Sequence, residues 1–144
     1  MREPTLLYVE DEDAAVFLLE TALKEAGIRV ELYRVSDGEE ALAFLQRSGA
    51  YEKAPIPDLI LLDLNLPRKD GIEVLREIQR DDSLRKIPTV MFTSSALASD
   101  RKRSLDSGAQ EYITKPSTFD RFLDAVKRVC AYLPGCNPTE AGEV

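Results

Sequence analysis

The candidate reactive residues of this chain share one feature, which is that each ends or follows a short apolar segment. They are Glu10, Asp11, Asp63, Thr93 and Lys115. Carboxylates held close together repel one another and favour a bound cation, and an all-oxygen ligand set suits Mg²⁺ or Mn²⁺. A lysine suits a phosphate oxygen, and a carboxylate can be a phosphorylated nucleophile. These residue types predict a phosphoryl-transfer site with Asp63 as the acceptor.

The chemistry requires that these residues meet, so the next question is which elements position them. Short apolar segments alternate with longer segments of helical periodicity. Such alternation predicts βαβ units and a doubly wound parallel sheet covered on both faces, whose strands end at one common edge. The strands are expected at residues 5–9, 30–35, 59–63, 87–93 and 111–114, and the helices at 13–27, 36–49, 70–80, 99–107 and 118–133.

Local signals predict how some of these helices begin. Asp13 is expected to be the N-cap of the first helix, with Glu12 facing solvent. The spacing of Ser36 and Glu39 predicts a capping box at the second helix. A long proline-bearing loop, residues 48–58, precedes the third strand.

The last helix carries an apolar stripe that should face the sheet. Its members are Phe119, Phe122, Leu123, Val126, Val129, Cys130 and Leu133. The end of this helix, at Tyr132 and Leu133, is expected to be exposed beside the fifth strand. Together with an irregular tail over residues 134–144, it predicts a homodimer interface. The expected domain therefore spans residues 1–133.

Composition excludes several classes of function. The chain has 144 residues, no histidine, and two cysteines, Cys130 and Cys136, without a CxxC pattern, which argues against a Cys/His zinc site and a histidine-based catalytic triad. A net charge of −7 argues against direct contact with nucleic acid. No apolar segment has the length of a membrane helix or of a signal-peptide core, so a cytoplasmic protein is expected.

Four motifs in register resemble the receiver domain of two-component response regulators over roughly residues 1–133. They are "LLYVEDE", "LLDLNLPRKDG", "MFTSS" and "GAQEYITKP". The resemblance implies a flavodoxin-like sheet with strand order 2-1-3-4-5. It also implies a signalling protein, which accepts a phosphoryl group from a sensor histidine kinase and catalyses only its own phosphorylation and dephosphorylation.

The resemblance assigns a role to each motif residue. It implies a Mg²⁺ or Mn²⁺ site made by Glu10, Asp11, Asp63 and the backbone carbonyl of Asn65. It further implies that Thr93 and Lys115 bind the phosphoryl group, that Thr93 and Tyr112 form the switch, and that the bond before Pro116 is cis. Glu10 stands where the family more often has aspartate, and its longer side chain still suits a contact to the metal through water.

Finer features resemble the stand-alone receivers paired with bacterial phytochrome kinases. These features are the long loop over residues 48–58, the "FLQ" and "LNLP" segments and the lack of a following output domain. A bacteriophytochrome kinase is therefore an expected partner, together with a downstream protein that the sequence does not identify.

Three other functions fit the residues less well. A phosphohydrolase with an aspartate nucleophile needs a second acid at the position of Asn65. A degenerate receiver that only binds partners would be expected to lack Asp63 or Lys115, and both are present. A DNA-binding regulator needs a helix-turn-helix or a basic tail after Leu133, where eleven residues follow.

Overall fold

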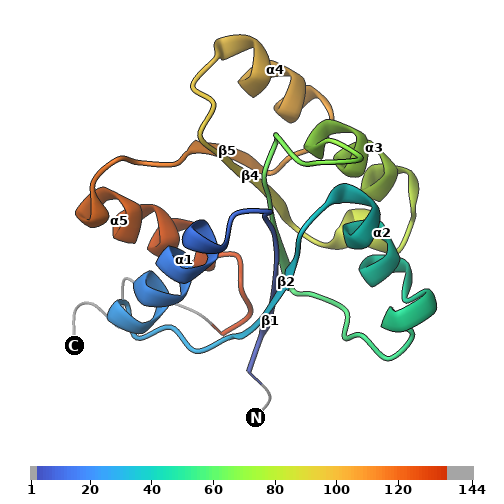
Figure 1. Cartoon of the computed structure of the whole chain (residues 1–144), viewed down its shortest axis with the longest axis horizontal. Coiled ribbons are helices and arrows are strands. Elements are labelled where there is room, and N and C mark those ends of the chain that lie inside the picture. The colour runs from blue at the N-terminus through green and yellow to red at the C-terminus, as the bar shows by residue number, and fades with distance from the viewer. Residues whose placement is uncertain (1–2, 136–144) are drawn as a thin grey trace.

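A five-stranded parallel sheet forms the centre of the computed structural model, which describes residues 3–135 (Figure 1). The strand order is β2-β1-β3-β4-β5, which confirms the predicted doubly wound sheet and its order. Val9 lies beside both Val35 and Leu62, so the residues that follow these strands share one edge. The strands are β1 Thr5–Val9, β2 Glu31–Val35, β3 Leu59–Leu62, β4 Thr89–Thr93 and β5 Glu111–Thr114.

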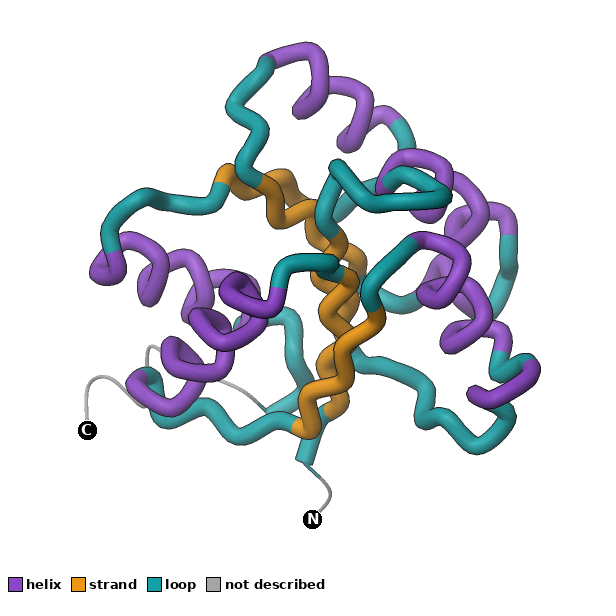
Figure 2. The backbone as a smooth tube through the Cα atoms, in the orientation of Figure 1, coloured by secondary structure: helices purple, strands orange, loops and turns teal. Residues whose placement is uncertain are grey.

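Helices cover both faces of this sheet, as Figures 1 and 2 show. The helices α1 and α5 lie side by side on one face, whereas α2 and α3 pack on the other, with α4 next to α3 and β5. The helices are α1 Asp13–Glu25, α2 Gly38–Gln46, α3 Gly71–Arg80, α4 Ala98–Asp106 and α5 Phe119–Cys130, with short 3₁₀ turns at Gly49–Tyr51 and Leu84–Lys86.

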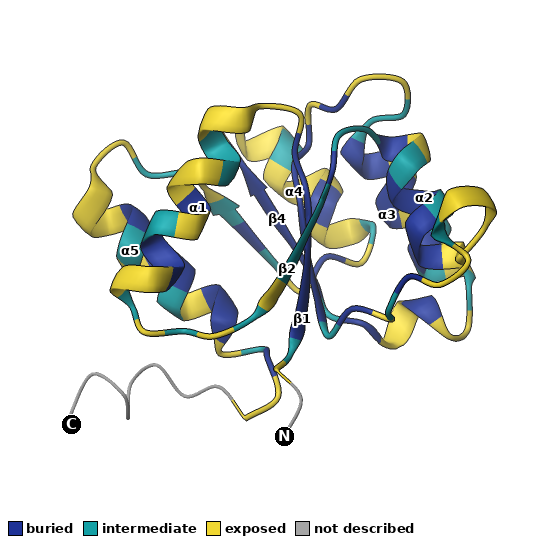
Figure 3. Cartoon of the chain, turned by 60° about the horizontal axis from the view of Figure 1, so that its bottom comes forward, coloured by how far each residue is buried: buried dark blue, intermediate teal, exposed yellow. Residues whose placement is uncertain are grey.

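The central strands are buried on both sides, which explains their uniformly apolar sequences. In β1, Leu6 and Tyr8 pack in the cluster shared with α1 and α5, whereas Leu7 and Val9 pack in the cluster shared with α2 and α3. Figure 3 shows the buried strands between helices whose outer faces are exposed. The two hydrophobic clusters hold the strand ends, and hence the site residues, in a common frame.

Two predicted helix caps are wrong, each by one residue. The N-cap of α2 is Asp37, whose side chain accepts a hydrogen bond from Glu40 N at 2.8 Å, while Glu40 Oε1 accepts one from Ser36 N at 2.6 Å. Because β2 runs to Val35, the chain leaves the sheet at Ser36 before it can turn into the helix.

The first helix begins differently from the prediction. Its N-cap is Glu12, which makes no capping hydrogen bond through its side chain, and Asp13 is the first helical residue. Asp13 Oδ1 instead accepts a hydrogen bond from Arg34 Nη1 at 2.8 Å. Asp13 thus forms an exposed ion pair with β2 and no helix cap.

The end of the last helix contradicts the expected exposed patch. The helix stops at Cys130, Leu133 is 3% exposed within the core, and Tyr132 donates a hydrogen bond to Glu111 Oε1 at 2.6 Å. Phe119, expected in the buried stripe, is 38% exposed. The predicted tail lies outside the described residues from position 136 onward, so the boundary at residue 133 stays a prediction.

Among the helices within residues 3–135, none is both long and apolar enough to cross a bilayer.

Candidate functional site

Glu10 lies directly after β1 and is fully buried. Both of its carboxylate oxygens are hydrogen-bonded: Oε2 accepts from the backbone N–H of Glu12 at 3.1 Å, and Oε1 accepts from the Tyr8 hydroxyl at 3.3 Å and from Lys115 Nζ. A buried carboxylate needs such partners because desolvation penalises its charge. The carboxylate is therefore held in one orientation by contacts from β1, from the loop after β1 and from the segment after β5.

Asp63 follows β3, and its backbone N–H donates to Val9 O at 3.1 Å, which aligns it with the end of β1. Its Oδ2 lies 3.8 Å from Lys115 Nζ. Its Oδ1 is buried and has no hydrogen-bond partner among the described residues. Buried acceptors are nearly always paired, so this oxygen marks a position where a ligand is expected.

The loop after Asp63 presses tightly against the residue. Gly71 N donates to Leu64 O at 2.9 Å, and a Cβ at position 71 would collide with the Asp63 carbonyl oxygen and lie 2.9 Å from Leu64 Cα. Only glycine allows this approach of α3 to the end of β3. The loop leaves Asn65 exposed at the same edge of the sheet.

Lys115 and Thr93 are joined through the backbone, since Lys115 N donates to Thr93 O at 2.7 Å. The Lys115 ammonium contacts Glu10 and lies 5.9 Å from the centre of the Phe92 ring. Thr93 is fully buried, and its Oγ1 accepts a hydrogen bond from Ser95 N at 3.4 Å. The predicted cis bond before Pro116 is wrong here, because the peptide bonds of residues 3–135 are all trans.

Tyr112 is buried on β5 and tied to the loop after β4. Its hydroxyl donates to Ser95 O at 2.8 Å, and its backbone carbonyl accepts a hydrogen bond from Arg101 Nη1 on α4 at 3.3 Å. Ser95 also contacts α4, since its hydroxyl donates to Asp100 Oδ2 at 2.6 Å. Tyr112 thus connects the loop beside Thr93 with the α4–β5 surface.

Two residues at the site were missed by the sequence analysis. Tyr8 contacts Glu10 from β1, and burial together with the carboxylates of Glu10 and Asp63 raises the pKa of its phenol, which keeps the hydroxyl protonated as a donor. Arg34 donates from Nε to the Glu10 carbonyl at 2.7 Å. The available signals were weak: one tyrosine in an otherwise aliphatic strand, and one arginine near the end of the next.

Three acids gather at this edge of the sheet. The carboxylate oxygens of Glu10, Asp11 and Glu12 lie within 4.8 Å of one another. The sequence analysis placed Glu12 only in solvent; it is exposed, yet it joins this cluster. Asp63 is connected to the cluster through Lys115, which contacts Glu10 and approaches Asp63. With the unpartnered Asp63 Oδ1, this donor set fits a hard divalent cation.

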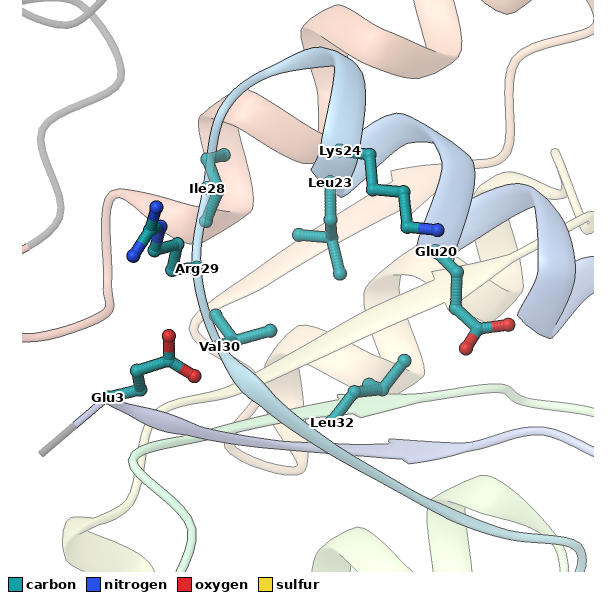
Figure 4. Close-up of a pocket in the computed structure, with 8 residues that line it drawn as sticks. All are labelled: Glu3, Glu20, Leu23, Lys24, Ile28, Arg29, Val30 and Leu32. Atoms are coloured by element: carbon teal, nitrogen blue, oxygen red, sulfur yellow. The ribbon is translucent and has the colours of Figure 1, made fainter.

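A separate pocket of about 310 Å³ lies away from these acids (Figure 4). Leu23, Val30 and Leu32 point into it, with charged side chains such as Glu20 and Lys24 at its rim. Its residues come from α1, from the segment entering β2 together with Leu32 in that strand, and from Glu3 before β1, toward the amino ends of the strands. The acidic site therefore lies at the carboxyl edge, where open α/β sheets bind ligands, and not in this pocket.

Comparison with known proteins identifies the family. The model of the response regulator receiver domain matches residues 6–127. The chain belongs to the response regulator receiver family. Receiver domains are signalling proteins rather than enzymes acting on separate substrates.

Relatives of this receiver domain include response regulators linked to phytochromes. It is 46% identical over 110 residues to the response regulator Rcp1 of Synechocystis sp., covering 76% of this chain and 75% of Rcp1. A crystal structure of Mn²⁺-bound Rcp1 matches with a TM-score of 0.84 at 39% identity, over 93% of this chain and 97% of that one. The phosphorylated cyanobacterial phytochrome response regulator RcpA matches with a TM-score of 0.85 at 38% identity, over 94% and 100%.

Proposed function

We propose that this receiver domain accepts a phosphoryl group on Asp63 from a sensor histidine kinase, with Mg²⁺ bound, and signals through a change in the surface around α4 and β5. The observation that carries the proposal is the Asp63 carboxylate, whose buried Oδ1 lacks a partner within the described chain while Lys115 stands 3.8 Å from Oδ2. The phosphorylated relative RcpA supports the same reading.

In the proposed step, an Asp63 carboxylate oxygen attacks the phosphorus of a phosphohistidine. A P–O bond forms while the P–N bond breaks, and the histidine of the kinase leaves with the electron pair. Lys115 then neutralises an oxygen of the new phosphoryl group, and the Thr93 hydroxyl donates a hydrogen bond to another. Hydrolysis, in which water attacks the phosphorus and the P–O bond to Asp63 breaks, would return Asp63 to the carboxylate and release inorganic phosphate.

The residues that would hold the cation are Glu10, Asp11, Asp63 and the backbone carbonyl of Asn65. When bound, a divalent cation neutralises charge on the phosphoryl oxygens. The clustered carboxylates and the unpartnered Asp63 oxygen support this assignment. Rcp1 has been crystallised with Mn²⁺, which supports a divalent site in a relative.

The proposal is tested by phosphorylation with radiolabelled acetyl phosphate and with candidate kinases. The wild-type chain should be labelled in Mg²⁺ and not in EDTA, and Asp63→Asn should lose the label. Asp82→Asn is the matched control, because Asp82 is exposed and forms a surface ion pair with Arg85. Label on Asp63→Asn at the wild-type level would rule out Asp63 as the acceptor.

We further propose that Thr93 and Tyr112 act as the switch. Phosphorylation adds about −1.5 to −2 charge, which draws the Thr93 hydroxyl toward the phosphoryl group. The Tyr112 ring should then turn into the space that Thr93 vacates, which shifts the population of the α4–β5 surface. The Tyr112–Ser95 and Arg101–Tyr112 hydrogen bonds support such coupling.

The switch is tested with Thr93→Ala. This variant should accept phosphate but fail to activate the downstream partner, and the NMR resonances of the Tyr112 ring should move on phosphorylation in wild type and stay in place in the variant. Thr21→Ala, a half-buried position on α1 whose hydroxyl donates to Phe17 O within the same helix, is the control and should behave as wild type. Equal movement of the resonances in Thr93→Ala and wild type would refute the coupling.

Similarity to RcpA and Rcp1 makes a bacteriophytochrome the kinase to test first. The downstream protein, a homodimer, a cytoplasmic location and the self-catalysed dephosphorylation stay predictions. Phosphotransfer from purified candidate kinases of the same organism, compared by initial rate, is the direct way to find the cognate partner.

A further inference from the structure

Tyr8 is a polar contact of the acidic edge that the proposed function leaves unassigned. The residue is fully buried in β1, and its ring packs against Phe92 with centroids 6.4 Å apart. Its hydroxyl reaches past the end of the strand to Glu10 Oε1 at 3.3 Å. A phenylalanine would fill the same core position and keep the ring packing without this hydroxyl, so packing alone does not account for a tyrosine.

The partners of Glu10 show what the hydroxyl can do. Oε2 is held by the backbone of Glu12, whereas Oε1 is shared between Tyr8 and Lys115. The proposed function requires the Lys115 ammonium to turn toward a phosphoryl oxygen on Asp63. When Lys115 turns away from Glu10, the hydroxyl of Tyr8 is the remaining side-chain donor to Oε1 within residues 3–135.

We propose that Tyr8 is a positioning residue that holds the Glu10 carboxylate in its ligand orientation independently of Lys115. The inference rests on the proposed metal site and adds a specific residue to it. Glutamate has one more rotatable bond than aspartate, so fixing its carboxylate requires more restraint. Without the Tyr8 hydroxyl, metal binding itself would have to order Glu10, and affinity would fall.

The test measures Mn²⁺ affinity by electron paramagnetic resonance of free Mn²⁺, on the full chain without phosphate. Tyr8→Phe keeps the ring packing and should weaken Mn²⁺ binding about tenfold, as is typical for a residue that orients a metal ligand. In the Glu10→Asp background the same substitution should have little effect, because the shorter carboxylate lies farther from the hydroxyl. Tyr33→Phe makes the same chemical change in the aromatic cluster with Phe44 and should bind Mn²⁺ as wild type does.

Each result decides the question. A selective loss in the Glu10 background supports the inference. Unchanged or tighter binding in Tyr8→Phe overturns it, as does an equal loss in both backgrounds, which would mean a general packing effect. An unmodified chain that binds no Mn²⁺ would instead remove the proposed metal site, and the inference with it; this failure is distinguishable because it is seen without any substitution.

Discussion

Lys115 compensates two carboxylates from different strands. Its ammonium contacts the fully buried Glu10 and lies near Asp63. The lysine side chain is itself only 14% exposed. A buried charge that loses its partner is far more costly than one exposed to water. The lysine therefore stabilises the metal-free domain as well as serving the proposed phosphoryl site.

This double role predicts the behaviour of Lys115→Gln. In EDTA we expect its free energy of unfolding to be about 3 kcal/mol lower than that of wild type, because Glu10 stays buried with a weaker partner. Saturating Mg²⁺ should narrow the difference, since the cation supplies the missing positive charge. Urea unfolding followed by circular dichroism, with EDTA or with MgCl₂, measures both values.

The control for this prediction is Lys102→Gln. Lys102 forms an exposed pair with Asp106 on α4, and pairs exposed to solvent contribute little to the free energy of unfolding. A Lys115→Gln variant that matched this control in EDTA would show that Glu10 is compensated without the lysine.

At the scale of elements, the long loop before β3 is held to α2 by a polar and aromatic contact. The ring of Tyr51, in the 3₁₀ turn Gly49–Tyr51, packs against Phe44 with centroids 5.4 Å apart, and its hydroxyl donates to Glu40 Oε2 at 2.6 Å. The other oxygen of Glu40 accepts from Ser36 N. One carboxylate thus joins the end of β2, the start of α2 and the loop.

This contact predicts a pH-dependent stability. The hydrogen bond to Glu40, with burial and the charge of Glu40, raises the pKa of Tyr51 from 10.0 to about 12. The pKa of Tyr51 is higher in the folded than in the unfolded state. The contribution of its hydrogen bond to the free energy of unfolding is therefore fully present below pH 10 and is lost as pH rises toward 12. The free energy of unfolding of wild type, measured with urea, should be about 1 kcal/mol higher than that of Tyr51→Phe at pH 8.5. At pH 11 this difference should be smaller.

Glu40→Gln provides the comparison for this element. It removes the charge that raises the pKa, so its stability relative to Tyr51→Phe should vary less with pH than that of wild type. A difference between wild type and Tyr51→Phe that stays constant from pH 8.5 to 11 would argue that the hydroxyl contributes no linked proton.

At the scale of the whole molecule, the acidic site and the pocket lie at opposite edges of the sheet. The acidic site lies at the carboxyl edge of the sheet, and the pocket lined by Leu23 and Val30 lies toward the opposite edge. The chain after α5 packs back onto the domain, since Leu133 is buried and Tyr132 is hydrogen-bonded to Glu111. The predicted dimer surface is thereby reduced to residues 134–144.

The dimer prediction must therefore be tested with a chain that keeps Leu133. Deleting this residue would remove about 2 kcal/mol of apolar burial and confuse unfolding with dissociation. We expect light scattering to report a dimer for the full chain and a monomer for a chain ending at Gly135, with similar thermal unfolding of both. A monomer in both cases removes the dimer, and a dimer in both places its interface elsewhere.

The sequence alone was sufficient to predict the parallel sheet and the order of strands and helices along the chain. Strands buried on both faces are apolar along their length, so the segments "LLYV" and "LILL" predict buried strands. The residues that follow them meet because parallel strands share a carboxyl edge. The apolar segments are local patterns within single strands, and the common edge follows once the sheet is parallel.

Only the tertiary structure decided which atoms touch. Lys115 contacts Glu10 across 105 residues of sequence, and Tyr8 and Arg34 reach the same residue from two strands. The cap at Asp37 and the burial of Leu133 likewise depend on where β2 ends and on how the chain after α5 packs. Such contacts depend on angstrom-scale distances between separate elements, which hydrophobic periodicity and residue spacing do not encode.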